Sequence, residues 1–576
     1  MRIDDDMRLD IAGADIHQHG FLPVAAAYCR SIDLIGLVNK MVPSQMVVKP
    51  GQIVQAMVLD TLSGRSPLYR LSEFMAEQDV ELLIGEKIDP EKFNDTNVGR
   101  ALDAIFKAGS SKVLTECGVR ATELFKLDTS VISYDTTSTN VWGDYYDCES
   151  KTPPLGPVVT HGYSKDHRPD LKQFMTELLC VERGIPIFGR SLDGNSSDKT
   201  SNNEMLGNIS SIMAKNGVGP GAFVYVADSA MVTESNLESV GSNLFITRLP
   251  ANYKECKVAI SKAVEADEWA VMGVLAETKE TKNRPSARYK SYETSVNIHG
   301  KKYRAIVVHS SAHDKRRQKK LEKDITASEK EINRKIGKQS IRFSCQPDAD
   351  KAAKALNNIS TKLHSVKASV NAVEVKKRGR PPAGGSSPTQ TRYDLTWELV
   401  LDDNEVQTLK KIAGCFVLLT NVPIDGEMGM DSTASLRTYK GQYGVESDFA
   451  FLKDPLVVND IFLKTPSRID ALGMVLIISL MIWRLMERSM RAYVENEKTT
   501  LPGWNRQKTK LPTAFMMTTI MTGIMVVATS KGKCFLSKPK LNQMIYLEAL
   551  GLDPEVFTNS SSRCRPIIPK KMTSGG

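Results

Sequence analysis

The sequence has no closely spaced cysteines, although it contains nine of them. Their scatter excludes the paired spacing of a zinc site and gives no disulfide framework, which fits a reducing compartment. The first residues, Met-Arg-Ile-Asp-Asp-Asp, also lack the apolar stretch of a signal peptide. We therefore expect a cytoplasmic protein.

An apolar run long enough to cross a membrane is also missing. Two stretches, 471–483 and 514–527, are strongly apolar but fall short of the roughly 20 apolar residues that a spanning helix needs. We expect both to be buried helices, and we expect no association with a membrane.

The surplus of positive charge is small, since 76 basic and 67 acidic residues give a formal net charge of +9. Such a surplus does not by itself indicate a nucleic-acid partner, and the clustering of basic residues decides more. With 576 residues, 41% of them hydrophobic, the chain can bury several cores. We expect two to four structural units.

Residues 1–127 are predicted to form a small helical domain. Apolar residues recur at helical spacing in 52–62 and 98–106, and Asp95 or Thr96 is a candidate N-cap of the second helix.

From residue 128 the pattern changes to short apolar strands. The predicted elements are strands over 131–135, 173–181 and 185–192, a helix over 203–214, a strand over 223–228, a helix over 234–240 and a strand over 244–248. Three strands, helix, strand, helix, strand is the order of an RNase H-like core. We assign 128–253 to the first part of such a core.

Residues 254–426 interrupt this order and form a predicted insertion. A hairpin is expected over 292–298 and 303–309, joined at His299-Gly300. Apolar seams over 321–336 and 356–370 predict two charged helices packed as an antiparallel helical hairpin. We interpret most of their Lys and Arg residues as solvated faces.

The remaining elements of the insertion surround a basic linker over 376–392, which is flexible by composition. Strands are expected at 395–401 and 416–420. After the insertion, a helix is expected over 438–453, and the rest of 427–576 is expected to be mostly helical.

Two carboxylates stand at the ends of apolar strands, Asp135 and Asp228. If these strands are neighbours, both acids lie at one edge of the sheet, where two close like charges need a cation between them. Many strands end in Asp only because a turn begins there. The two aspartates alone therefore do not establish a metal site, and a third acid is needed.

Tyr439, Gln442, Glu446 and Lys453 supply that third acid in the spacing Tyr-x2-Gln-x3-Glu-x6-Lys, which places all four on one face of a helix. The spacing resembles the Tyr-x2-Arg-x3-Glu-x6-Lys signature of the insertion-sequence-four superfamily of bacterial DDE transposases. Segments 134–138 and 226–230 resemble its two aspartate motifs, and 161–173 resembles a block shared between them.

One position departs from the signature, because Gln442 stands where the family has Arg. A Gln side chain can donate to a phosphate oxygen but brings no charge. Arg437, Lys440 or a basic residue of the N-terminal domain could supply the charge instead.

The resemblance implies an α/β fold. It has an RNase H-like catalytic core, a helical N-terminal domain and a large insertion before the last catalytic helix. Asp228 and Glu446 are 218 residues apart (446 − 228), which leaves room for that insertion. Family members carry a mainly β insertion there, to which we add the helical hairpin, and the core resumes over 427–576.

The resemblance also implies the activity, which is cut-and-paste DNA transposition of a bacterial insertion sequence, a mobile element. Two Mg²⁺ ions, with Mn²⁺ as a substitute, would be bridged by Asp135 and held singly by Asp228 and Glu446. They would serve strand cleavage at element ends and strand transfer to target DNA. The expected partners are duplex DNA, as terminal inverted repeats and target, and a second copy of the chain in a homodimer.

Further DNA contacts are expected from four kinds of residue. Tyr439 and Lys453 would grip phosphates. Phe416 precedes Val-Leu-Leu-Thr where hairpin-forming relatives have a Trp, and it either stacks on a flipped base or packs in a core. Arg378 and Arg380, in an Arg-Gly-Arg-Pro run, resemble an AT-hook for narrow minor grooves, the alternative being a plain basic linker.

Two other functions stay open at this point. A catalytically inactive, DNA-binding derivative would not need all three carboxylates. Another RNase H-like nuclease would need neither the spacing from Tyr439 to Lys453 nor the long insertion.

Overall fold

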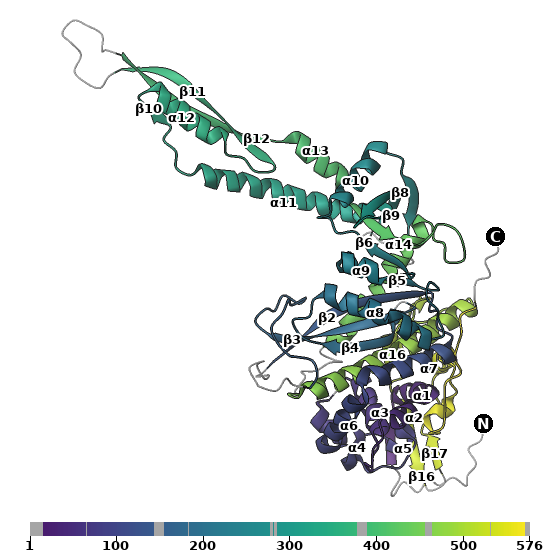
Figure 1. The fold of residues 1–576 in the computed structure, drawn as a ribbon. Helices are drawn as coiled ribbons and strands as arrows, with labels where there is room; N and C mark the ends of the chain where they lie inside the picture. Colours follow the sequence, from purple (N-terminus) through teal and green to yellow (C-terminus); the bar gives the residue numbers. More distant parts are fainter. Residues whose placement is uncertain are drawn as a thin grey trace. The chain divides into compact units, whose positions relative to one another are not determined.

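We describe the fold from a computed structural model (Figure 1). It divides into two compact units, which are unit 1 (Met1–Thr247 and Asn421–Gly576) and unit 2 (Arg248–Thr420). The residues described are 15–64, 66–142, 155–182, 184–276, 280, 285–376, 389–454, 463–529 and 532–570.

The N-terminal part of unit 1 is helical, as predicted. Its helices are α1 (Leu22–Ser31), α2 (Leu34–Met41), α3 (Pro50–Leu62), α4 (Leu71–Ala76), α5 (Val80–Ile84), α6 (Asp95–Ala108) and α7 (Ser110–Phe125), with short turns η1 (Leu68–Arg70) and η2 (Pro90–Phe93). Helix α3 is buried along its whole length, because α1, α2 and α6 surround it. The N-cap of α6 is Asn94, one residue before the predicted Asp95, and its side chain accepts from the Asn97 N–H.

A mixed sheet forms the centre of unit 1. Its strands run in the order β4-β3-β2-β5-β6, with β3 antiparallel to both neighbours and β5 parallel to both of its own. The predicted element order is confirmed by β2 (Val131–Val141), β3 (Lys172–Val181), β4 (Ile185–Leu192), α8 (Asp198–Lys215), β5 (Val224–Val226), η3 (Ser229–Met231), α9 (Glu234–Ser239) and β6 (Leu244–Arg248).

The C-terminal part of unit 1 returns to this sheet, where α16 and α7 both pack against β4 (Figure 1). Its elements are α14 (Ser432–Gly441), α15 (Tyr443–Lys453), α16 (Pro466–Asn496), β14 (Leu501–Pro502), η4 (Trp504–Arg506), β15 (Lys508–Thr509), α17 (Ala514–Ile520), β16 (Met525–Thr529), β17 (Gly532–Phe535), α18 (Leu541–Ala549) and η5 (Pro554–Phe557). Strand β16 pairs with β17 and with the N-terminal strand β1 (Asp15–Gln18).

The two strongly apolar stretches, 471–483 and 514–527, form different structures. Within the described residues, α16 is long and apolar enough to cross a membrane, but 83% of its most apolar window is buried inside the protein, as in the core helix of a soluble protein. The prediction of one helix over 514–527 is wrong. Helix α17 ends at Ile520, and Gly523 turns the chain with a positive φ of 76° before β16 begins.

Unit 2 begins with α10 (Lys254–Ala266) and an antiparallel sheet in the order β13-β9-β8-β7. Its strands are β7 (Ala270–Val274), β8 (Arg288–Ile298), β9 (Lys301–Ser310) and β13 (Cys415–Thr420). The predicted hairpin is confirmed. Ile298 pairs with Lys301, and His299 and Gly300 both have positive φ, as a tight two-residue turn requires.

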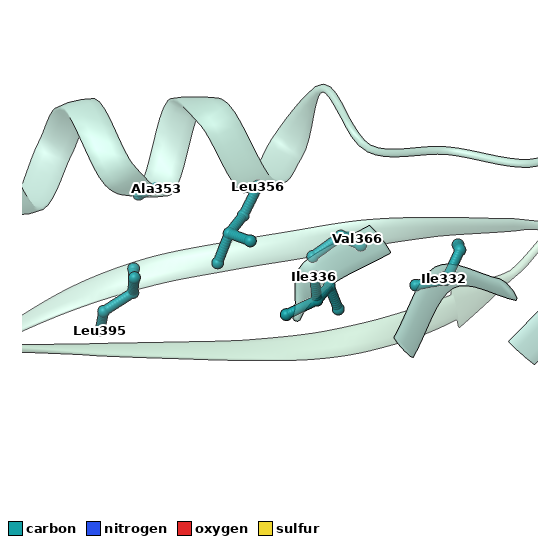
Figure 2. Close-up of a cluster of buried hydrophobic side chains, with 6 residues drawn as sticks. All are labelled: Ile332, Ile336, Ala353, Leu356, Val366 and Leu395. Carbon is teal, nitrogen blue, oxygen red and sulfur yellow. The ribbon is translucent and has the colours of Figure 1, made fainter. Parts of the chain in front are cut away.

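The rest of unit 2 is a three-stranded antiparallel sheet, two strands of which form a long ribbon with helices on one face. It comprises α11 (Ser311–Ile336), β10 (Arg342–Phe343), α12 (Gln346–Asn357), β11 (His364–Lys376), β12 (Thr389–Leu401) and α13 (Asp403–Ile412). Figure 2 shows side chains from α11, α12 and both ribbon strands packed into one apolar cluster. This cluster gives the ribbon a core of its own.

The predicted helical hairpin is therefore wrong in its second half. Helix α12 ends at Asn357, and the residues that suggested a helix continue as β11. Val366 and Val370 face the cluster while Lys367 and Ser369 are exposed, which is the two-residue alternation of a strand. Apolar residues spaced three and four apart over so short a stretch do not distinguish the period of a helix from that of a strand.

The basic linker is shorter than predicted. Lys376 is the last residue of β11 and pairs with Thr389, the first residue of β12. Residues 389–392 therefore belong to the ribbon. Arg378 and Arg380 lie outside the described residues, so the AT-hook resemblance stays a prediction.

Candidate active site

Two predicted acids of unit 1 belong to neighbouring parallel strands, since Asp135 lies on β2 and Asp228 follows the end of β5. The register pairs Val131 with Val224 and Ser133 with Val226. Each acid comes two residues after that last pair, so continuing the register sets them side by side on one face of the sheet. The predicted juxtaposition of the two strands is confirmed.

Asp135 does not end its strand, contrary to the sequence-based expectation. Strand β2 continues to Val141, because β3 pairs with it over its full length after β5 has ended. Asp228, by contrast, follows β5 and caps the turn η3, where its carboxylate accepts from the Ala230 N–H at 3.0 Å. The Thr247 hydroxyl donates to the Asp228 carbonyl at 2.7 Å and fixes its backbone.

Both carboxylates are held in an environment that disfavours their charge. Burial raises the pKa of Asp135 to about 7, while Lys165 and the Thr136 N–H oppose the shift and Asp228 adds to it. Burial also raises the pKa of Asp228, and the charge of Asp198 adds to that increase. Crowded carboxylates of this kind are stabilised by a bound cation.

Lys165 supplies a positive charge from within the protein. Its ammonium group lies 3.9 Å from Asp135 Oδ1 and 3.2 Å from Asp198 Oδ1, and it donates to the Thr136 carbonyl at 2.6 Å. Asp198, in the first turn of α8, also accepts from the Thr136 hydroxyl. We did not identify Asp198 from the sequence, because it begins a helix rather than ending a strand.

The signature residues lie on two helices, not on the single predicted helix. Helix α14 ends at Gly441 and α15 begins at Tyr443, with Gln442 between them in helical conformation. The buried Gln442 side chain donates to the Tyr134 carbonyl at 3.4 Å, next to Asp135. This amide fixes the start of α15 against β2, and the expectation that Gln442 contacts phosphate stays a prediction.

Glu446 lies in the first turn of α15, four residues after Gln442, and is exposed. Helix α15 packs against β2, which brings Glu446 to the strand that carries Asp135. Within the described residues, however, no group of three or more acidic, His or Cys side chains is arranged to hold a metal ion. The convergence of Glu446 with the two aspartates stays a prediction.

Buried charges beneath α15 fix its position. Asp448 is fully buried, and its carboxylate pairs with the Arg484 guanidinium of α16 at 2.7 Å. Arg484 also pairs with Glu487 at 2.7 Å and donates to the Ser447 hydroxyl at 2.9 Å. Burial raises the pKa of Asp448 to about 7, and Arg484 opposes that shift. This network ties α15 to the core helix α16.

The block 161–173 joins α15 to β2. Lys453, at the end of α15, pairs with both Asp166 oxygens at 2.7 and 2.8 Å. The Asn140 side chain on β2 donates to Asp166 at 3.2 Å, and the Ser138 hydroxyl accepts from the Lys165 N–H at 3.0 Å. Lys453 thus braces the site. Tyr439 is half-buried on α14 and makes contacts within the protein.

Phe416 belongs to unit 2, where it is half-buried on β13 opposite Val308. The Arg248 guanidinium carbon lies 5.2 Å from the centre of its ring, and His313 packs edge-on at 6.2 Å. The ring is therefore partly accessible and already stacked on a cation. Another aromatic residue of unit 2, Trp397 on β12, packs against the apolar cluster that contains Val366 and Leu395.

The chemistry of the donors suits a hard divalent cation. The acids at the edge of β2 and β5 offer carboxylate oxygens, which are the ligands that Mg²⁺ prefers. Asp135 and Asp228 are crowded and largely shielded from solvent, and a cation between them would relieve their repulsion. The residues present therefore fit magnesium in kind.

The comparisons with known proteins concern the N-terminal part. Residues 14–119 match the family described as Domain of unknown function (DUF4277). This range runs from the start of β1 into α7 and thus covers the helical part of unit 1. A search of curated proteins finds no match. The chain therefore carries a DUF4277 domain, and its acidic site lies outside the matched range.

Proposed function

We propose that this protein is a DDE transposase that cuts DNA at the ends of an insertion sequence and joins those ends to target DNA. The observation that carries the proposal is the acid pair on neighbouring parallel strands, Asp135 and Asp228, with the helix of Glu446 packed against the same strand β2. The strand order β4-β3-β2-β5-β6 supports an RNase H-like core. The DUF4277 domain is found in transposase-like proteins, which agrees with the proposal.

In this proposal Asp135, Asp228 and Glu446 would hold two Mg²⁺ ions. Bound magnesium supplies an activated water or 3′-hydroxyl and stabilises the leaving oxygen. Glu446 is the exposed member and lies in the first turn of α15. The two aspartates are held by hydrogen bonds from backbone N–H groups and provide the fixed part of the site.

The neighbouring side chains keep this arrangement in place. Lys165 balances the negative charge of Asp135 and Asp198 before DNA and metal arrive. Gln442 and Lys453 hold the two ends of α15, through Tyr134 and Asp166 respectively. They act as positioning residues. Exposed Arg437 on α14 is better placed than Gln442 to meet a phosphate.

The partners follow from the chemistry. The substrates would be duplex DNA, both the terminal inverted repeats and the target, and two copies of the chain would pair the two ends. We assign the N-terminal helical domain to DNA-end binding or to dimerisation.

The test is cleavage of a duplex that carries the DNA flanking the reading frame. We expect the native protein to nick it in Mg²⁺ or Mn²⁺ and not in EDTA. Asp135→Asn and Asp228→Asn should bind the duplex but fail to nick it. Asp403→Asn, at an exposed position in the first turn of α13, is the control and should cut normally. Nicking by Asp135→Asn would overturn the proposal.

A further inference from the structure

Helix α11 of unit 2 separates its charges by face. Seven basic residues lie on one side, and we call them the basic face of α11. They are Lys315, Arg316, Lys319, Lys320, Lys323, Lys330 and Arg334, and all are exposed. Steps of three, four and seven keep such residues on one side of a helix.

This face lies opposite the buried side of α11. Leu321 packs with Leu363 and Val406, and Ile332 and Ile336 pack into the cluster of Figure 2. Each of these three core residues is two positions from a residue of the basic face. Two positions correspond to about 200° around a helix. The ribbon and α13 therefore cover one side of α11, and the cations project from the other.

The acids of α11 are excluded from the basic face. At about 100° per residue, the seven cations fall within a sector of about 140° around the helix axis, and the acids Asp314, Glu322, Asp324, Glu329 and Glu331 fall outside it, with Glu322 and Glu331 at its margins. None of the seven cations forms an ion pair within the part of the chain that the structure describes. Lys335, just off this face, pairs with Glu331 at 2.8 Å.

Such an arrangement is not that of an ordinary solvated helix. A solvated face commonly alternates in sign, with acids four residues from bases. Here Lys315, Lys319 and Lys323 follow one another at four-residue steps, as do Lys330 and Arg334. Like charges at this spacing destabilise a helix, and a bound polyanion would relieve the repulsion.

We propose that the basic face of α11 binds the phosphate backbone of duplex DNA. The choice of DNA among polyanions rests on the proposed function. From Lys315 to Arg334 the face spans about 28 Å, at roughly 1.5 Å per residue, which approaches one turn of B-DNA. Because the opposite side of α11 is buried, the helix meets phosphates along one side. The binding is therefore independent of base sequence.

The experiment compares two triple variants of the full chain by fluorescence anisotropy on a duplex of scrambled sequence. The first carries Lys319→Gln, Lys323→Gln and Lys330→Gln on the basic face. The control carries Lys335→Gln, Lys362→Gln and Lys367→Gln, which removes the same charge from lysines of unit 2 that are already paired with Glu331, Glu405 and Glu398. Circular dichroism checks that both variants are folded.

We expect the first variant to bind about tenfold or more weakly, with a salt slope reduced by about 2 to 3, since each lost phosphate contact removes about 0.9 from the slope. The control should stay within about twofold of the native protein. Equal loss in both variants would overturn the proposal, as would tighter binding of the native protein to duplex RNA than to DNA.

A nicking assay at low salt and saturating protein keeps this inference separate from the proposed function. There the basic-face variant should still nick, whereas Asp135→Asn should not. If the native protein binds through α11 but never nicks, the proposed activity is wrong and the proposed DNA interface still stands. Native nicking combined with unchanged binding by the basic-face variant would sink the interface alone.

Discussion

The acid site of unit 1 and the basic face of α11 in unit 2 are both clusters of like charge, yet they are built differently. Asp135 and Asp228 are largely buried and share an internal counter-ion, Lys165. The seven cations of the basic face are exposed and form no ion pair within the described residues. Burial makes charge costly and demands a partner within the fold, whereas water and salt screen an exposed cluster.

The comparison teaches where each ligand should act. A divalent cation should change the stability of the acid site, because it replaces an imperfect internal counter-ion there. A polyanion at α11 should change affinity and its salt dependence far more than stability, because the face is already solvated. The predictions below test this distinction, from the largest expected effect to the smallest.

The largest effect is expected at Asp135 and Glu446, one buried acid and one exposed acid. Asp135→Asn and Glu446→Gln should both lower nicking at least about a thousandfold, if both hold metal. Only Asp135→Asn should raise the melting temperature in EDTA, by a few degrees, because it removes one of two crowded buried charges. Thermal melting and nicking of the same samples give the comparison. A Glu446→Gln protein that nicks normally would remove Glu446 from the site.

A buried cation should behave unlike those of α11. Arg484→Met leaves Asp448 and Glu487 buried without their partner, so we expect about 3–5 kcal/mol of destabilisation. Arg120→Met, which breaks an exposed pair with Glu123, should cost under about 1 kcal/mol. Urea unfolding measures both variants. Adding Asp448→Asn to Arg484→Met should recover part of the loss, and no recovery would argue against the charge explanation.

Phe416 offers a test within unit 2, where an aromatic ring lies next to the cation Arg248. If the ring stacks on a flipped base, Phe416→Ala should slow hairpin formation about 10- to 100-fold while sparing the first nick, since one stacked base is worth about 1–3 kcal/mol. End-labelled DNA on a denaturing gel separates the two steps. Parallel loss of both would make Phe416 a packing residue, and Phe416→Leu is the control for packing alone.

Lys165 tests the internal counter-ion directly. Lys165→Met should destabilise the protein in EDTA by about 1–2 kcal/mol, and Mg²⁺ should restore most of the loss, because the acids then gain another cation. Lys453→Met is a matched control, with a side chain 24% exposed against 26% for Lys165 and a carboxylate partner outside the acid pair. Equal rescue of both variants by Mg²⁺ would mean a general salt effect.

Much of unit 1 could be predicted from its sequence because its strands are short, apolar and separated by turns. Strands β4 and β6 begin and end where predicted, and the two aspartate strands are neighbours. The length of β2 could not be predicted, because its polar second half, Thr136 to Asn140, is fixed by pairing with β3. Asp198 was missed for a similar reason, since only the tertiary fold brings the start of α8 to Thr136.

Unit 2 was harder to predict because the spacing of its apolar residues fits both a helix and a strand. The first row of apolar residues, which includes Ile332 and Ile336, correctly predicted the helix α11. The second combined the end of α12 with a strand whose apolar residues happen to follow helical steps. The basic face of α11 was present in the sequence, but it gained meaning only when the structure showed which side of the helix is buried.

The smallest effect is expected at His19 in the DUF4277 range, a buried group that avoids charge. His19 is 3% exposed, and within the described residues its Nε2 atom has no hydrogen-bond partner. Burial lowers its pKa to about 4, Asp79 opposes that shift, and His17 and Lys533 add to it. Because the folded pKa lies below the unfolded value near 6.5, the stability is complete above pH 6.5 and is lost as the pH falls toward 4.

The matching experiment measures urea unfolding at pH 7.5 and pH 5.5. The native protein should lose about 1 kcal/mol between these values through His19, since one pKa unit corresponds to about 1.4 kcal/mol. His19→Gln should lose less, because Gln does not titrate. His17→Gln is the control, since His17 is more exposed and should leave most of the pH dependence in place. If His19→Gln keeps the full pH dependence, the acid sensitivity comes from other groups, and a buried neutral His19 does not limit stability.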